Sequence, residues 1–315
     1  MNRRPQEEVI GMFYRNFAKM FKGFPKFTGS NLTQKIGNPP KLKSKPVFCM
    51  WSDLLGFSNH FTECNWNLSK KHKQRIYARL VAAHSSVLYY SRPDERNLIL
   101  NDGIAKIYSI PEYEKNTLGA LGLFLRYCIE LHMTISNTEK HDGYPGCRSV
   151  ITFGEYIEYL ADEVRFDDYV FNYSKPQGSD ISDIAKNIGN PLVIYNPKEL
   201  QMNTAFSKAY ILEGGGQRIG IKGNNIYIDQ SVIDVIPDYA HYQKKEVVWQ
   251  ELDEEIRFLV PYDARNLNEV FLGFAFDKDP IKVEGQKYNT TVYRLRKLFP
   301  YDEKVDEFYF DLDNP

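Results

Sequence analysis

The chain alternates between apolar runs and regularly spaced apolar positions, which predicts strands and helices in succession. A continuous apolar run over 46–53 ends at Asp53 and is typical of a buried strand. Apolar residues at helical spacing over 69–90, after a basic start, predict an amphipathic helix. Residues 96–110 indicate two short strands joined by an Asn-Asp-Gly turn at 101–103, because these residue types tolerate the positive φ angles of a tight hairpin.

The same patterns predict further elements toward the C-terminus. These are helices over 118–133 and 197–213 and strands over 148–153 and 191–195. Glycines 214–216 follow the second helix and are predicted to end it, because the segment lacks the Lys and Ser/Thr of a phosphate-binding P-loop. From residue 244 onward strand-like residues mix with acidic, helix-like stretches, and the pattern gives this segment no role.

Composition narrows the class of protein. The 315 residues suffice for one large domain with additions, and we expect an N-terminal extension over 1–45, a central catalytic domain over 46–243 and a C-terminal elaboration over 244–315. Lys and Arg number 40 against 41 Asp and Glu, so no basic surplus favours nucleic acid or an acidic membrane as a partner. The four cysteines lack metal-binding spacing, which indicates reduced thiols.

The sequence also bears on location. No apolar run approaches the ~20 residues that a membrane-spanning helix needs, and the N-terminus lacks a signal-peptide core, so we expect a cytoplasmic protein. An amphipathic stripe over 12–21 is interpreted as packing on its own domain, with contact to a membrane or partner as the alternative.

Two acidic residues are the strongest candidates for chemistry. In the segment Asp-Leu-Leu-Gly-Phe-Ser at 53–58, Asp53 ends the predicted strand and a glycine turn follows, so backbone N–H groups can meet a phosphate while the carboxylate holds a divalent cation. Helix capping by Asp53 is the simpler alternative. One crossover helix separates Asp53 from Asp102, so both can reach one sheet edge and hold two metals for phosphoryl or nucleotidyl transfer. The alternative at Asp102 is an ordinary turn.

Four segments, in this order, resemble motifs of the class III adenylyl and guanylyl cyclases. Residues 53–58 resemble the family's Asp-x-x-Gly-Phe-Ser/Thr motif, and 101–103 resemble its Gly-Asp hairpin. Residues 148–154 resemble its Arg-Ile-Gly-Ile-His-x-Gly strand, and 202–205 its Val-Asn-x-Ala helix opening. The resemblance covers roughly 46–213. It implies an α+β fold, an α/β sandwich in which helices flank an antiparallel or mixed sheet with a ferredoxin-like core.

The resemblance also implies a role for each matched residue. Two Mn²⁺ or Mg²⁺ ions per site are expected on Asp53, Asp102 and the Leu54 carbonyl, the triphosphate on Gly56, Phe57 and Ser58, and the ribose or transition state on Asn203. The family usually has an Arg four residues after this Asn, where the chain has Ser207 with Lys208 beside it. Lys208 is a candidate replacement, although an ammonium cannot make the bidentate phosphate contacts of a guanidinium.

The position that reads the base departs from the purine pattern. Adenylyl cyclases carry a Lys four residues before the second metal-binding Asp, and this chain has Leu98 there. The chain resembles the Pycsar antiphage pyrimidine cyclases, which implies a homodimer with composite active sites that converts UTP to 3′,5′-cyclic UMP and pyrophosphate, with the product read by a separate cyclic-nucleotide effector. Conversion of CTP is the first alternative, and conversion of ATP or GTP ranks after it. Ser207 favours another alternative, a catalytically silent nucleotide-binding module.

Trp51, Asn97 and Gln201 are candidates for contacting the base.

Two other polar features have simple structural interpretations. His60 lies close to the predicted phosphate turn, and a lone His there is interpreted as a polar surface or packing residue. Arg75 and Arg79, with the lysines at 70, 71 and 73, indicate a solvated face of the helix over 69–90.

Overall fold

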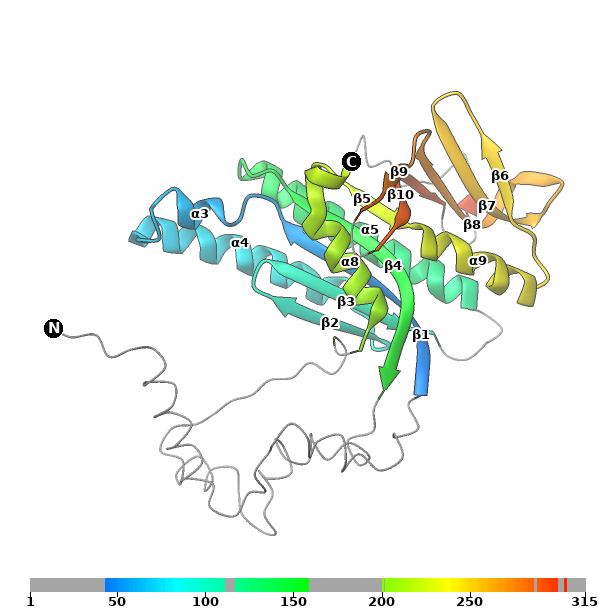
Figure 1. Cartoon of the computed structure of the whole chain (residues 1–315), viewed down its shortest axis with the longest axis horizontal. Helices are drawn as coiled ribbons and strands as arrows, with labels where there is room; N and C mark the ends of the chain where they lie inside the picture. Colours follow the sequence, from blue (N-terminus) through cyan, green and yellow to red (C-terminus); the bar gives the residue numbers. More distant parts are fainter. Residues whose placement is uncertain are drawn as a thin grey trace, which may run out of the picture. The chain divides into compact units, whose positions relative to one another are not determined.

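The computed structural model describes residues 43–110, 117–158, 200, 202–285, 288–299 and 303–304. These described residues form one compact unit (Figure 1). The strand predicted over 191–195 and the amphipathic stripe over 12–21 lie outside the described residues.

A single mixed sheet carries the fold, and its strands are antiparallel to their neighbours except for the parallel pair β4 and β5. Its main path runs β2-β3-β1-β4-β5-β10-β8-β7-β6, with β9 beside β10 and β11 beside β8. The strands are β1 (Lys43–Leu54), β2 (Glu95–Leu100), β3 (Gly103–Ser109), β4 (Cys147–Glu158), β5 (Ile226–Asp229), β6 (Val248–Glu251), β7 (Glu255–Asp263), β8 (Asn266–Asp277), β9 (Ile281–Val283), β10 (Thr290–Phe299) and β11 (Glu303–Lys304).

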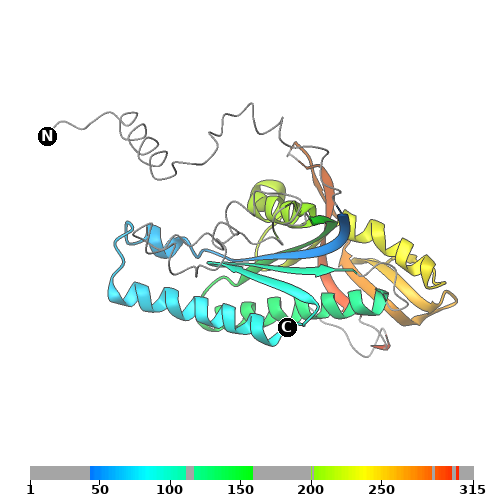
Figure 2. The ribbon, with the colours of Figure 1, turned by 90° about the horizontal axis from the view of Figure 1, so that it is seen from below.

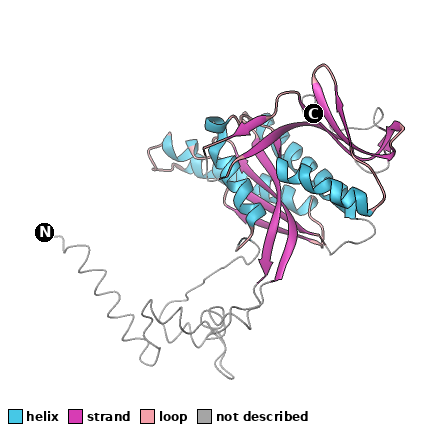
Figure 3. Ribbon diagram, turned by 45° about the vertical axis from the view of Figure 1, so that its right-hand side comes forward, coloured by secondary structure: helices cyan, strands magenta, loops and turns pink. Residues whose placement is uncertain are grey.

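Helices cover both faces of the sheet, as Figures 2 and 3 show. They are α3 (Asn59–Thr62), α4 (Lys70–Tyr89), α5 (Thr117–His141), α8 (Thr204–Gly215) and α9 (Gln230–Tyr242), with the 3₁₀ turn η3 at Gly216–Ile219. The predicted α+β fold, with helices flanking a mixed sheet, is confirmed. The helix predicted over 69–90 is also confirmed, and it begins after Ser69, whose side chain accepts a hydrogen bond from the His72 N–H.

The central strand β1 is buried on both faces, which explains its unbroken apolar run. Its side chains alternate, so Phe48 and Met50 pack in the cluster that contains α5, while Cys49 and Trp51 pack in the cluster that contains α8. The same alternation places Asp53 on the α8 face at the C-terminal end of the strand.

Helix α5 extends well beyond the predicted 118–133, because apolar and buried polar residues keep one face in the core as far as Glu139. By length and composition it is also the one helix in the described part of the chain apolar enough to cross a membrane, with mean hydropathy 1.3. However, 61% of that stretch is buried inside the fold. The helix therefore packs as a core helix does.

The segment after residue 244 completes the sheet. The described residues of this segment form strands and turns only, so the helix-like stretches expected there are wrong for this described part, while residues 305–315 lie outside it. Four acidic residues, Glu251, Asp253, Glu254 and Glu255, lie at the tight turn between β6 and β7, where the Leu252 N–H donates to the Glu255 carbonyl (2.9 Å). Strand β10 pairs with both β5 and β8, so strands from both sides of residue 244 share one sheet.

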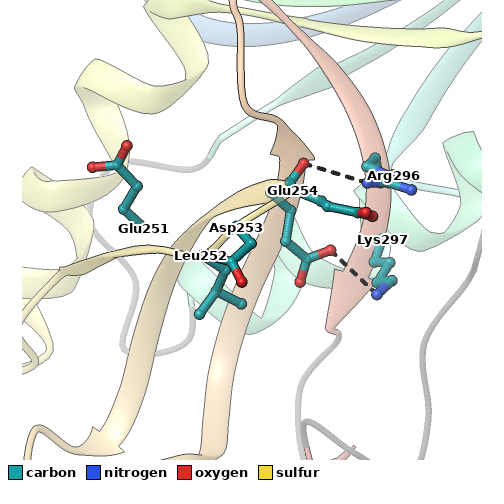
Figure 4. Close-up of a pocket in the computed structure, with 7 residues that line it drawn as sticks. Glu251, Leu252, Asp253, Glu254, Arg296 and Lys297 are labelled. Atoms are coloured by element: carbon teal, nitrogen blue, oxygen red, sulfur yellow. Dashed lines mark hydrogen bonds and ion pairs between the residues drawn. The ribbon is translucent and has the colours of Figure 1, made fainter.

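The acidic turn borders an open hollow of about 500 Å³ (Figure 4). Lys297 from β10 forms an ion pair with Glu255 (3.2 Å), and Arg296 donates to the Glu254 carbonyl (3.4 Å). These contacts tie the turn to β10 and so contribute to the joining of the C-terminal strands.

Gly103 allows the hairpin to approach the centre of the sheet. It pairs with Asp53 across β1 and β3, and any Cβ at this position would overlap the six-membered ring of Trp51. We expect Gly103→Ala to lower the free energy of unfolding by about 1–3 kcal/mol through overpacking. Gly214→Ala is the control, since no atom lies within 4 Å of a Cβ there and Ala favours a helix. Urea denaturation of both variants measures the difference, and equal stabilities would contradict the expectation.

Candidate functional site

The two acidic residues singled out from the sequence meet at one edge of the sheet. Asp53 pairs with Gly103 across β1 and β3, so Asp102 lies one residue from the partner of Asp53. The Leu54 N–H donates to the Asp102 carbonyl (3.3 Å), which fixes the hairpin tip against the end of β1. The positive φ of Asn101 (60°) turns the chain at this tip, as the sequence predicts.

The surroundings of Asp53 favour a bound cation. Burial and, to a smaller extent, the negative charges of Glu213 and Asp102 together raise the pKa of its carboxyl to about 7, while Arg148 opposes them. Asp53 and Asp102 are therefore close enough to repel each other. A cation between them would remove the repulsion and return Asp53 to its ionised form.

An ion pair flanks the two carboxylates. Arg148 is the second residue of β4 and pairs with Asp53 across β1 and β4. Its guanidinium donates to both the carboxylate and the backbone carbonyl of Glu213 near the end of α8 (Nε to Oε1, 3.0 Å; Nη2 to the carbonyl, 3.1 Å). The sequence places Arg148 in a strand motif but predicts no role for it, and no predicted site residue corresponds to Glu213. The signal in the sequence that could have pointed to Glu213 is its position at the end of the helix predicted over 197–213.

The turn after β1 has the shape that a phosphate-binding turn requires. The Leu55 N–H donates to the Gly146 carbonyl (2.9 Å), and Gly56 adopts φ +66°, which favours glycine. Within the described residues, no backbone carbonyl pairs with the N–H of Gly56 or of Ser58, and both residues are exposed. These two amides are therefore available to a ligand.

Phe57 departs from its predicted role. Its side chain is 2% exposed and packs in the core, and its N–H donates to the Leu54 carbonyl (3.3 Å). Its own carbonyl accepts from the His60 N–H (3.2 Å). Phe57 therefore supports the turn from behind, and its side chain does not face a ligand.

Asn203 and Lys208 lie away from the acidic pair within one chain. Asn203 is the N-cap of α8, where its side chain accepts from the Phe206 N–H (2.9 Å) and its backbone bridges Tyr156 on β4. Lys208 donates to the Phe153 carbonyl (3.0 Å). The length of α8 separates Asn203 from Glu213, which lies beside Asp53, by ~15 Å along the helix axis.

The three candidates for contacting a base do not form a group. Trp51 packs on the α8 face with Leu98, is 5% exposed, and has no hydrogen-bond partner for its Nε1 among the described residues. Asn97 is adjacent to Leu98 on β2 and points to the opposite face, where its Nδ2 donates to Ser91 (3.0 Å). Gln201 lies outside the described residues.

The solvated helix face predicted on α4 is correct for its lysines and Arg75 and wrong for Arg79. Arg79 is 3% exposed and forms an ion pair with Glu139 of α5. It follows Ile76 by three residues and precedes Ala83 by four, so helical spacing places it on the apolar stripe. That spacing could have identified it. His60, also buried, is the packing residue that the sequence suggested.

The donor set at the edge fits a hard divalent cation. Asp53, Asp102 and the Leu54 carbonyl supply oxygen ligands, which Mg²⁺ and Mn²⁺ prefer. Among the described residues no cluster of three or more His, Cys, Asp or Glu gathers as a metal centre. The two carboxylates would therefore need the backbone carbonyl, water or the phosphates of a ligand to complete the coordination.

Comparison with known proteins gives similarity in structure only. No family model matches the chain, and no curated protein matches it. The structure is similar to the adenylyl cyclase CyaB from P. aeruginosa, at 13% identity over 84% of this chain and 98% of that chain, with a TM-score of 0.37. It is also similar to the guanylate cyclase domain of RhGC from Catenaria anguillulae, solved with GTP, at 13% identity over 80% and 97%, with a TM-score of 0.40. Similarity at this level assigns no activity or substrate to this chain.

Proposed function

We propose that the chain is a nucleotide cyclase that uses Asp53 and Asp102 to bind the metal ions of a metal–nucleoside triphosphate complex. The observation that carries the proposal is the meeting of these two carboxylates at one sheet edge, beside a glycine turn with two available amides. These residues belong to the segments that resemble class III cyclase motifs in order. The resemblance and the geometry therefore support the same site.

Each group of residues at the site has its own proposed role. Asp53, Asp102 and the Leu54 carbonyl would hold the cations, whose charge would lower the pKa of the ribose hydroxyl and offset that of the triphosphate. The Gly56 and Ser58 amides face the phosphates and stabilise charge that develops on them. Arg148, already beside Asp53, adds positive charge near the same oxygens, and Glu213 holds its guanidinium in place.

The separation of Asn203 from Asp53 supports the proposal of a head-to-tail homodimer. One chain does not bring its own Asn203 to its own acidic pair, so a second copy would supply it across a two-fold axis. Each dimer would then contain two composite sites. In the single chain the Asn203 side chain caps α8, where its Oδ1 accepts from the Phe206 N–H.

The choice of base is proposed from the absence of the Lys that reads the purine in adenylyl cyclases. Leu98 stands where a purine-reading Lys would lie and is buried with Trp51, so it cannot make the hydrogen bond by which that Lys reads a purine. We propose UTP as the substrate, cyclic UMP and pyrophosphate as the products, a separate effector that reads cyclic UMP, and a role in antiphage signalling. CTP is the first alternative. The silent nucleotide-binding module is favoured by Ser207, whose hydroxyl bonds the Asn203 carbonyl (2.9 Å).

One assay tests this proposal. The purified chain is incubated with each of the four radiolabelled nucleoside triphosphates and Mn²⁺, beside Asp102→Ala. We expect a cyclic product from UTP with the wild type and a loss of at least ~10³-fold in the variant, because removal of one carboxylate disrupts both metal positions. Product from CTP alone would revise the substrate. No product from any triphosphate would support the silent module.

A further inference from the structure

A single buried guanidinium joins the turn after β1 to the two long helices. Arg79 projects from α4, and its Nε donates to both carboxylate oxygens of Glu139 on α5 (3.0 Å each). Its Nη2 donates to the Leu55 carbonyl in the turn (3.2 Å), and its Nη1 meets His60 Nε2 (3.0 Å). The guanidinium carbon also lies 4.1 Å from the centre of the Tyr144 ring. The turn is therefore held from its inner side by a planar group with little freedom to move.

The contact with Leu55 sets the direction of one amide. The peptide bond between Leu55 and Gly56 is trans, since the described chain has no cis peptide, and a trans peptide directs its C=O and its N–H to opposite sides. Arg79 holds the carbonyl toward α4, so the N–H of Gly56 points away from α4. This is one of the two amides that no backbone carbonyl occupies in the described structure.

We propose that Arg79 is a positioning residue that aims the Gly56 amide at a bound phosphate. The inference rests on the proposed function for the identity of the site, and it adds a residue that touches neither metal nor substrate. Because Gly56 at φ +66° lacks a side chain to restrain it, its peptide plane is free to rotate unless something fixes the carbonyl. Arg79 is the group in contact with that carbonyl.

Holding the Leu55 carbonyl in place requires the several N–H donors of the planar Arg79 guanidinium. Glu139 occupies one edge of the guanidinium, and the remaining donors reach Leu55 and His60. A Lys at this position keeps the charge but presents a single point of contact, so it cannot serve Glu139 and the Leu55 carbonyl in the same fixed plane. Arg79→Lys therefore tests the geometry separately from the charge.

Selective labelling makes the Gly56 amide visible in the full chain. The sequence contains four Leu-Gly pairs, at 55–56, 118–119, 121–122 and 272–273, so labelling Leu carbonyls with ¹³C and Gly amides with ¹⁵N gives four correlated resonances. The other three pairs belong to α5 and β8 and serve as internal references. Inorganic pyrophosphate with Mg²⁺ is the probe, and turnover is not needed.

We expect pyrophosphate to shift the Gly56 resonance of the wild type and leave the other three in place. In Arg79→Lys the Gly56 resonance should be displaced before the probe is added, and the dissociation constant for pyrophosphate should rise about tenfold, the loss of one hydrogen bond to a charged group. Val87→Ala, a buried truncation on the same helix, is the stability control and should bind pyrophosphate as the wild type does.

The wild-type titration tests the inference even if Arg79→Lys does not fold, because a Gly56 resonance indifferent to pyrophosphate overturns it. Equal binding by folded Arg79→Lys and the wild type also overturns it. If pyrophosphate shifts the Gly56 resonance but the protein forms no cyclic nucleotide, the proposed function is contradicted and this inference stands. If the protein forms cyclic nucleotide but pyrophosphate leaves the Gly56 resonance unchanged, this inference is contradicted and the proposed function stands.

Discussion

Asp53→Asn is expected to abolish formation of cyclic nucleotide while making the metal-free protein more stable at pH 8. The loss of activity follows from removing one of the two carboxylates that would hold the cations, and it should reach at least ~10³-fold. The gain in stability follows from the raised pKa of this buried carboxyl. A residue placed for folding alone would not show opposite effects on activity and stability.

The sign of the pH effect follows from the two pKa values of Asp53. Its pKa is about 7 in the folded chain and ~4 in an unfolded one. The folded state therefore binds the extra proton between these values, and this contribution to stability is full below pH ~4 and lost as the pH rises through about 7. Asn carries no such proton. We expect the stability of the two proteins to converge near pH 4 and to differ by about 2 kcal/mol at pH 8, allowing for the partial exposure of Asp53.

Chemical denaturation in EDTA at pH 4 and pH 8 measures the difference. Addition of Mg²⁺ at pH 8 should reverse the order, because the cation stabilises the wild type by binding the folded state and has less to bind in Asp53→Asn. Asp263→Asn is the matched control, a change of the same kind at an exposed residue on β7. A wild type that remains the more stable protein in EDTA at pH 8 would contradict this account of Asp53.

Mixing two inactive variants is expected to restore activity if the site is composite. Asp53→Asn damages the metal-binding half of a site, and Asn203→Ser damages the other half while keeping a side chain able to cap α8. In a heterodimer of the two, one site receives both damaged halves and the other receives both intact ones. Random exchange makes half of the dimers heterodimers, so the mixture should recover about one quarter of wild-type activity.

The control for this experiment lies within the same site. Asp53 and Asp102 belong to one chain's half, so a mixture of Asp53→Asn with Asp102→Asn has no intact site in any dimer and should stay inactive. Product formation is measured after co-refolding or prolonged mixing of equal amounts of each pair. Recovery in both mixtures, or in neither, would exclude a composite site built from Asn203.

The central part of the fold was predictable because its signals are local. The apolar run of β1, the spacing of α4 and the turn at 101–103 each reflect a period of side-chain burial or a φ preference, which neighbouring residues determine. The acidic pair was predictable for a related reason. A strand, a helix and a hairpin leave few ways to arrange the strands in one sheet, and most of these bring Asp53 and Asp102 to the same edge.

The predictions failed where distant segments decide the environment. The strands after residue 244 bury their apolar faces against the rest of the sheet, and this partner cannot be read from their own acidic composition. Phe57 matched a ligand-binding motif, yet the core behind the turn takes its side chain.

The sequence by itself therefore determined the order of the elements in the central part of the fold and the two carboxylates. Only the tertiary structure decided which group pairs with Arg79, because Glu139 lies 60 residues away on another helix. It also decided that Glu213 and Arg148 lie beside Asp53 and that Asn203 does not. The physical reason is that local spacing fixes which face a side chain occupies, whereas the charge and solvation of that face depend on what the rest of the chain packs against it.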